Sequence, residues 1–235
     1  MIAIISDVHG NLPALTSVLA EIDRMGVERI ACLGDVAGYY SSVNECVEAL
    51  RARDIVNLMG NHDYYLTSGT GSPRSTSANR CLDYQRRTIT EDNLRWLAAS
   101  LPRGFADGVS MVHAGWNDPI DEYLYDVRPE YFHAFEGTSF ASGHTHIQGI
   151  WKFDGKVYCN PGSVGQPRDG DPRAAFSVWT DGTPTLCRVA YDIDETCRRM
   201  ERAGFEPYFY ENLYRGTRIG ARREVAPGSR SRWTT

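Results

Sequence analysis

The first hundred residues alternate between short apolar runs and longer stretches with apolar residues at helical spacing. The apolar runs lie at 2–5, 30–33 and 55–59, and the helical stretches at 12–25, 43–53, 77–87 and 91–100. The first helical stretch has Asn11 as a candidate N-cap, Pro13 in its first turn and Gly26 at its end. Strands that alternate with helices in this way predict an α/β fold.

After residue 100 the pattern changes to short strands separated by turns. Strand-like runs lie at 109–112, 139–142, 150–153, 156–159, 175–179 and 185–190. Asp154-Gly155 and Asp181-Gly182 each stand between two such runs, and Asp-Gly is a strong hairpin signal. A helix is expected at 193–203. Because both halves of the chain contain strands that need a common core, we predict a four-layer α/β/β/α sandwich with two mixed β-sheets.

The predicted sandwich forms one domain over residues 1–205, followed by a C-terminal extension at 206–235. The end of the chain is rich in Pro, Gly, Ser and Arg, so we expect the extension to be partly disordered and removal of 216–235 to leave function largely intact. Two stretches, 64–76 and 116–128, lack regular patterning. Each is either an ordinary surface loop or the rim of a substrate site.

Composition and charge exclude several classes of protein. The apolar runs are far shorter than the roughly 20 residues needed to cross a bilayer, and no signal-peptide pattern follows Met1. Six cysteines without a Cys-x-x-Cys pair indicate reduced thiols and a cytoplasmic protein. The net charge is −5 although residues 215–235 contain six Arg and one Glu, so the remaining body is strongly acidic. We expect no membrane or nucleic-acid partner for that body, and favour a solvated tail over one that binds nucleic acid or anionic lipid.

Polar residues with metal-binding side chains follow five of the predicted strands. They are Asp7 and His9 after the first run, Asp35 after the second, Asn61 and His62 after the third, His113 after 109–112, and His144 and His146 after 139–142. Open α/β sheets place their sites at such carboxyl ends of strands. Asp7 and His9 are two residues apart, so an extended backbone points both side chains to one side. Glycines before Asp35, Asn61 and His144 permit close approach of the backbone to a ligand.

These residue types form a donor set for a transition metal. Oxygen comes from two Asp and one Asn, and nitrogen from His9, His113, His144 and His146, a mixture suited to Zn, Mn, Fe, Ni or Co and less to Ca or Mg. A single histidine is more often an ordinary core or surface residue. Five of the six histidines fall in this pattern, however, which makes coincidence improbable. The sixth, His133, lies in a predicted helix and is assigned no site role.

The same residues stand in motifs that resemble the five ordered blocks of the calcineurin-like metallophosphoesterase superfamily. The blocks are Asp7-Val8-His9, Gly34-Asp35, Gly60-Asn61-His62-Asp63, the isolated His113 and Gly143-His144-Thr145-His146. The resemblance extends from residue 1 to about residue 190. Three further motifs resemble the small bacterial and archaeal, phosphodiesterase-like members: Gly38-Tyr39, Asn44-Glu45-Cys46 and Asn160-Pro161-Gly162-Ser163-Val164-Gly165.

The resemblance implies a hydrolase with two divalent transition-metal ions, Mn, Fe, Zn or Ni. One ion would take Asp7, His9 and His146, the other would take Asn61, His113 and His144, and Asp35 would bridge the two. His62 would not be a ligand. It would face the substrate and donate a proton to the leaving group, which suits an imidazole that titrates near neutral pH, with Asp63 as its partner.

The predicted function is hydrolysis of a phosphodiester or a small phosphorylated metabolite by metal-activated water. The alternatives are action on dinucleoside polyphosphates or phosphoproteins, and a non-catalytic scaffold like the retromer subunit that has lost key histidines. The second block lacks the extra Asp and the Arg of the protein serine/threonine phosphatases, and the retention of His62 and every ligand argues against a scaffold. Arg74 and Arg168 are candidate phosphate-binding cations or ordinary surface arginines. The expected partner is a small phosphorylated substrate, and an oligomer is left open.

Overall fold

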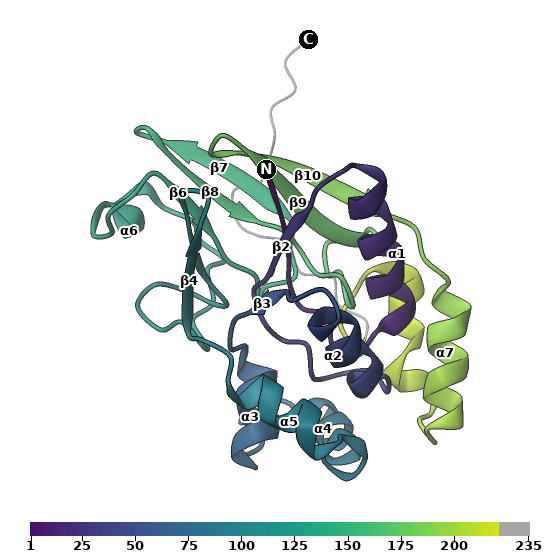
Figure 1. Ribbon diagram of the computed structural model, residues 1–235. Helices are drawn as coiled ribbons and strands as arrows, with labels where there is room; N and C mark the ends of the chain where they lie inside the picture. Colours follow the sequence, from purple (N-terminus) through teal and green to yellow (C-terminus); the bar gives the residue numbers. More distant parts are fainter. Residues whose placement is uncertain (221–235) are drawn as a thin grey trace.

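Two five-stranded β-sheets pack against each other in the computed structural model, which describes residues 1–220 (Figure 1). The first sheet has the order β10-β9-β1-β2-β3, with β1 (Ile2–Ile5), β2 (Arg29–Cys32), β3 (Val56–Asn57), β9 (Ala174–Thr180) and β10 (Thr183–Val189). The second has the order β4-β5-β6-β8-β7, with β4 (Arg103–Ala106), β5 (Val109–Val112), β6 (Ser139–Ala141), β7 (Gly149–Phe153) and β8 (Lys156–Asn160). Each sheet contains parallel and antiparallel pairs, which confirms the predicted mixed sheets.

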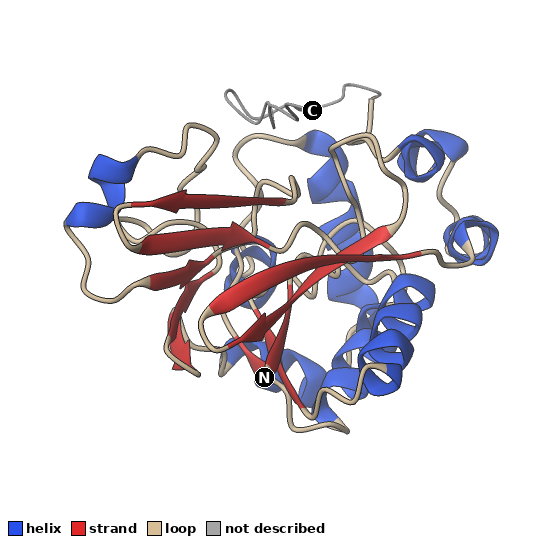
Figure 2. Ribbon diagram, turned by 90° about the horizontal axis from the view of Figure 1, so that it is seen from above, coloured by secondary structure: helices blue, strands red, loops and turns tan. Residues whose placement is uncertain are grey.

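Most helices lie on the side of the first sheet that faces away from the second sheet (Figure 2). They are α1 (Leu12–Arg24), α2 (Val43–Arg51), α3 (Asn61–Ser68), α4 (Thr76–Thr88), α5 (Glu91–Ala98) and α7 (Ile193–Arg202). In α1 the Asn11 side chain accepts a hydrogen bond from the Ala14 N–H, as its position before the helix predicts. Leu15, Val18 and Ile22 of this helix are fully buried against the first sheet.

The central strand β1 shows how the layers form. Ala3 and Ile5 belong to the core shared with the helices, whereas Ile2 and Ile4 belong to the core between the two sheets. A strand covered on both faces needs apolar residues at every position, which explains the unbroken apolar run at the start of the chain.

The outer face of the second sheet is covered by one short helix, α6 (Pro129–His133), and by the irregular segment 116–128. Trp116 and Phe132 pack there against Phe140 and Tyr158 of the sheet. The predicted four-layer sandwich is therefore confirmed, although its fourth layer is mostly loop. His133 has a side chain that is 54% exposed and lies 3.5 Å from Asp154, away from the residues that follow the strand ends.

Two sequence-based expectations about secondary structure are wrong. The stretch 64–76 was expected to be irregular, but α3 extends to Ser68 and α4 begins at Thr76. The helix is hard to recognise because its buried residues include Asn61, His62 and Asp63, so it has no apolar stripe. Strand β4 was not expected, because an apolar residue, Phe105, lies on its exposed face with Arg103, and its half-buried face has only Gly104 and Ala106.

Residues 207–215, which we placed in the C-terminal extension, form two 3₁₀ helices, η1 (Pro207–Phe209) and η2 (Glu211–Arg215). Phe209 and Leu213 are buried in a cluster with Cys81 of α4 and Met200 of α7. Gly216 packs against Asp171 and its carbonyl accepts a hydrogen bond from the Gly170 amide, so a deletion that starts at 216 would remove these contacts, and the expectation that it leaves function largely intact stays a prediction. The domain boundary at 205 stays a prediction, and the disorder expected for the end of the chain concerns residues 221–235, which lie outside the described part.

The helices of residues 1–220 are all too short or too polar to cross a lipid bilayer.

Candidate metal centre

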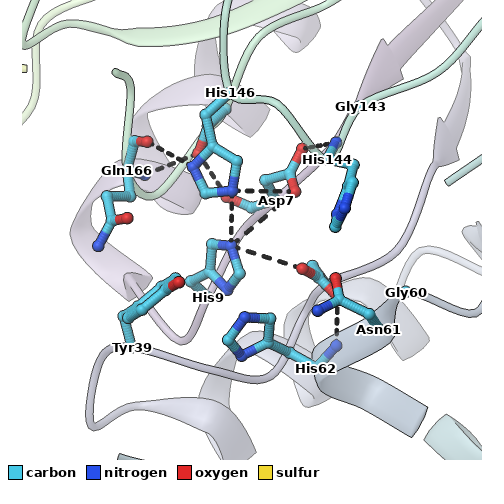
Figure 3. A network of polar contacts seen from close by, with 12 residues as sticks. Asp7, His9, Tyr39, Gly60, Asn61, His62, Gly143, His144, His146 and Gln166 are labelled. Atoms are coloured by element: carbon cyan, nitrogen blue, oxygen red, sulfur yellow. Dashed lines mark hydrogen bonds and ion pairs between the residues drawn. The ribbon is translucent and has the colours of Figure 1, made fainter. Parts of the chain in front are cut away.

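The predicted site residues lie close together at the carboxyl ends of strands from both sheets. Figure 3 shows six of them, Asp7, His9, Asn61, His62, His144 and His146. The side chains come from the turns after β1, β2, β5 and β6 and from the first turn of α3. All are buried: Asp7, His9, Asp35, Asn61, His62, His113, His144 and His146. The fold therefore brings together residues that are separated by more than a hundred positions in the sequence.

The backbone at these residues is left-handed rather than extended. Asp7, His9, Asp35, His144 and His146 have φ values between 53° and 64°. The extended conformation expected for Asp7 and His9 is therefore wrong. The amides of Asp7 and His9 donate to the carbonyls of Gly34 and Asp35, so the turn after β1 is tied to the turn after β2 while its side chains turn into the site. Asp and His adopt this conformation more readily than most residues, but it still costs about 1 kcal/mol or more.

The first ligand group consists of Asp7, His9 and His146. The Nε2 atoms of His9 and His146 are 3.1 Å apart, and Asp7 Oδ1 lies 3.3 Å from His146 Nε2. The other oxygen of Asp7 accepts a hydrogen bond from the backbone N–H of His144 at 3.0 Å. One carboxylate oxygen is thus fixed by the backbone, and the other points at the two imidazole nitrogens (Figure 3).

Backbone carbonyls fix the tautomers of this first group. His9 Nδ1 lies 2.8 Å from the Ala37 carbonyl oxygen, and His146 Nδ1 lies 2.6 Å from that of Gln166. A carbonyl only accepts, so each Nδ1 carries the hydrogen and each Nε2 presents a lone pair. Two lone pairs that face each other at 3.1 Å do not bond to one another, and a cation between them would satisfy both. Asp7 Oδ1 is likewise buried without a hydrogen-bond partner, so the first group fits a metal ion.

The second ligand group consists of Asn61, His113 and His144. His113 Nδ1 donates to the Leu33 carbonyl at 3.0 Å, which leaves Nε2 as the lone-pair atom. That Nε2 lies 3.2 Å from Asn61 Oδ1 and 3.1 Å from His144 Nδ1. Three donor atoms therefore converge on a second point, which also fits a metal ion.

Asp35 contacts both groups. Its Oδ2 lies 3.7 Å from His9 Nε2 and 3.5 Å from His113 Nε2, while its Oδ1 accepts from the His62 amide at 2.8 Å. Burial, followed by the charges of Asp63 and Asp7, raises the pKa of Asp35 well above its usual range. Burial also lowers the pKa of His9, His113 and His144, so these rings are neutral. Bound cations would stabilise both the ionised Asp35 carboxylate and the unpaired lone pairs of the histidine nitrogens.

Glycine is required next to two of these carboxylates. A Cβ atom on Gly143 would lie 2.5 Å from Asp7 Oδ2, and one on Gly60 would clash with Asp35 Oδ1. The close approach inferred for the glycines before Asn61 and His144 is therefore observed.

His62 lies beside the centre, at the start of α3. Its ring packs 4.9 Å from the Tyr39 ring and 5.0 Å from the His9 ring, and its Nδ1 is buried without a hydrogen-bond partner. Burial and then the charge of Arg168 lower its pKa to about 3. The expectation of titration near neutral pH is therefore wrong for the free protein. One ring nitrogen also lies within 4.8 Å of donor atoms of His9 and Asp35, so whether His62 is a ligand or a proton donor stays a prediction.

The Asp63 carboxylate is hydrogen-bonded to backbone amides and not to Nδ1 of the His62 ring, contrary to expectation. Its Oδ1 accepts from the Ala37 amide at 2.8 Å, and its Oδ2 accepts from the Gly60 amide at 3.3 Å. The carboxylate is used in this way because Asp63 is the third residue of α3, from where it reaches back to the residue before the helix. Since the Ala37 carbonyl holds the His9 ring, Asp63 supports the centre through the backbone.

A cleft of about 420 Å³ opens beside the centre. Its lining includes Tyr39, whose ring lies 4.7 Å from the His9 ring, and Tyr123, whose ring lies 4.0 Å from the His144 ring. Arg168 stacks on Tyr39, and Arg74 stacks on Tyr123. Tyr39 belongs to the Gly38-Tyr39 motif of the family resemblance, which assigned it no role, and Tyr123 lies in a segment without periodicity, so neither tyrosine was predicted to line a cleft. The segments 64–76 and 116–128 both contribute residues to this cleft, and their role as the rim of a substrate site stays a prediction.

Arg168 is not an ordinary surface residue. It is only 6% exposed, and its guanidinium donates to Gln166 Oε1 and to the Tyr39 hydroxyl. Arg74 is half-exposed and pairs with Asp121. Both candidate cations therefore line the cleft, and Arg168 is the one held rigidly.

The chain is similar to a known protein family and to several known proteins. The family model described as "Calcineurin-like phosphoesterase superfamily domain" matches residues 1–182. The chain is 33% identical to the uncharacterized protein MJ0912 of Methanocaldococcus jannaschii, covering 92% of this chain and 98% of that protein. It is 32% identical to a metallophosphoesterase from Sphaerobacter thermophilus of known structure, with a TM-score of 0.80 over 92% of this chain and 98% of the other. The hypothetical protein PH1004 from Pyrococcus horikoshii has the same fold, with a TM-score of 0.81 and 18% identity over 93% of this chain and all of that one.

Proposed function

Because the chain belongs to the calcineurin-like phosphoesterase superfamily, we propose that it hydrolyses phosphodiesters or small phosphorylated metabolites with the help of two divalent transition-metal ions. The observation that carries the proposal is the set of imidazole lone pairs aimed at two neighbouring points. His9, His113 and His146 each have the outer nitrogen fixed by a backbone carbonyl. These three carbonyls orient the Nε2 lone pairs of the histidines toward the interior of the site, which is the arrangement that metal-binding histidines have.

The first ligand group would hold one ion and the second ligand group the other, with Asp35 shared between them. Nitrogen and oxygen donors in this ratio suit Mn, Fe, Zn or Ni. When bound, such ions supply a nucleophile from water at neutral pH and offset negative charge that develops on the phosphoryl group.

His62 would donate a proton to the departing alkoxide. The ring packs against both His9 of the first ligand group and Tyr39 of the cleft, so a leaving group in the cleft would be within its reach. The ring is neutral in the free protein because burial and Arg168 disfavour its charged form. A negatively charged phosphoester beside the ring would offset the charge of Arg168 and stabilise the imidazolium, which would raise the pKa of His62, so the proton would be taken up together with substrate.

Arg168 would bind a phosphoryl oxygen. Its guanidinium is held by Gln166 and Tyr39, so little conformational entropy is lost when it forms a further hydrogen bond. Arg74 would contact the more distant part of the substrate at the opposite wall of the cleft.

The test is turnover by protein stripped of metal with a chelator and then reloaded with Mn, Fe, Zn or Ni in turn. The substrates are alkyl and nitrophenyl phosphodiesters, small phosphomonoesters, a dinucleoside polyphosphate and a phosphopeptide. We expect stripping to abolish turnover, reloading to restore it, and the diesters or small phosphoesters to react fastest. A preference for the dinucleoside polyphosphate or the phosphopeptide would contradict the substrate class. Two bound ions with no turnover on any substrate would support a scaffold instead.

A further inference from the structure

We infer that Asp121, in the irregular segment 116–128, is a positioning residue that orients His144 toward the second metal ion. The inference rests on the proposed function, because it concerns a ligand of the proposed centre.

His144 is the exception among the imidazoles of the two ligand groups. The outer nitrogens of His9, His113 and His146 each lie within hydrogen-bond distance of a backbone carbonyl. His144 instead points Nδ1 inward, 3.1 Å from His113 Nε2, and its outer Nε2 is buried without a hydrogen-bond partner. A ring whose Nδ1 serves as ligand carries its hydrogen on Nε2, and a buried N–H without an acceptor costs about 1–3 kcal/mol.

The carboxylate of Asp121 lies on that outer side. Its Oδ1 is 3.7 Å from His144 Nε2, slightly beyond hydrogen-bond distance. A small rotation of the aspartate would let the Nε2–H donate to it. A carboxylate in this position fixes the tautomer, holds the ring plane and makes the inward nitrogen a stronger ligand.

The segment that carries Asp121 is irregular but anchored. Glu122 Oε2 accepts from the Tyr131 hydroxyl of α6 at 2.6 Å and from the Asn117 amide at 3.1 Å. Glycine at position 115 makes room for that carboxylate. On the other side of Asp121, the ring of Tyr123 packs 4.0 Å from the His144 ring. The segment therefore supports His144 both from its face and from its outer nitrogen.

Asp121 also connects the centre to the cleft. The same Oδ1 atom that faces His144 accepts a hydrogen bond from Arg74, which lines the cleft. The ion pair and the histidine therefore compete for one oxygen. A substrate that draws Arg74 away would free this oxygen for His144.

The experiment measures metal affinity in the intact, full-length protein, with Co²⁺ as the probe because its visible absorption reports on both ligand groups. In Asp121→Ala we expect one of the two ions to bind roughly 10–100-fold more weakly, with the other unchanged. Asp121→Asn keeps an oxygen acceptor at the same place, so it should recover most of the lost affinity. Thermal unfolding of each variant shows whether the fold is intact.

Two variants separate this role from simple charge effects. Arg74→Ala removes the ion pair but leaves Asp121 free to accept from His144, so its Co²⁺ affinity should equal or exceed that of the wild type. Asp126→Ala removes the same charge from the same segment, where Asp126 pairs with Arg128 at the surface, and should have no effect. Unchanged affinity for both ions in Asp121→Ala, or an equal loss in either control, would overturn the inference. A wild-type protein that binds fewer than two ions would instead refute the proposed centre, and the inference with it.

Discussion

The two ligand groups are supported in different ways. Both imidazoles of the first group are held by carbonyls of the backbone, at Ala37 and Gln166. In the second group a carbonyl holds only His113, while His144 has a loop carboxylate as its nearest outer partner. Backbone carbonyls move only with the fold, whereas a loop side chain can change partner. The comparison suggests that the first group is preformed and that the second can respond to what occupies the cleft.

The largest effect is expected from Asp35, the residue that contacts both groups. Asp35→Ala should lose both ions and reduce turnover to background, because its oxygen stands between His9 and His113. The measurement is metal content per chain by mass spectrometry after dialysis, together with turnover. By contrast, His9→Ala and His113→Ala should each weaken mainly one ion.

Two tightly bound ions in Asp35→Ala would show that the groups are independent sites rather than halves of one centre. Loss of both ions in His9→Ala would show that the first group is a precondition for the second.

A smaller effect is expected from His62, whose ring lies close to the first group with its Nδ1 buried and without a hydrogen-bond partner. His62→Ala should keep both ions but lose about 10²–10⁴-fold in turnover number, the range for removal of a general acid. Alkyl phosphodiesters should lose more than nitrophenyl esters, because nitrophenolate departs without a proton. The measurement is the turnover number on a matched pair of diesters that differ only in the leaving group.

Equal losses on both diesters, or loss of an ion, would make His62 a member of the first group. A variant that is less stable yet fully active when folded would show that the ring only supports the turn at Gly60.

The smallest effect is expected from the two tyrosines at the cleft walls. Tyr39→Phe removes the hydroxyl that accepts from Arg168 at 3.1 Å, a loss of about 1–2 kcal/mol that should raise KM roughly 5- to 30-fold with little change in kcat. Tyr123→Phe is the matched control beside the second group, since its hydroxyl makes no hydrogen bond within residues 1–220. Steady-state kinetics on a single diester decides the comparison, and equal changes in both variants would remove the proposed role of Arg168.

Much of this architecture can be predicted from the sequence, because local patterns determine it. The unbroken apolar run at Ile2–Ile5 indicates a strand buried on both faces, and the Asp-Gly pairs mark the hairpins. The convergence of the site was predictable for a similar reason. Residues placed just after parallel strands lie at one edge of a sheet, whatever the distance between them along the chain.

Other features depend on contacts that leave no local pattern. Nothing near Asp63 indicates that its carboxylate accepts from Ala37 and Gly60 rather than supporting His62. Asp121 lies in a segment without periodicity, and its position near His144 is visible only in three dimensions. The pKa of His62 likewise depends on burial and on Arg168, more than a hundred residues away.

The left-handed backbone of the centre has a consequence for the evolution of this fold. Five site residues other than glycine adopt a conformation that costs up to about 1–2 kcal/mol each, a sum comparable to the 5–15 kcal/mol net stability of a typical domain. A descendant released from the proposed metal-dependent function could replace them with glycine or asparagine and become more heat-resistant. In a library selected for thermal tolerance alone, these positions are where gains in robustness and losses of function should coincide.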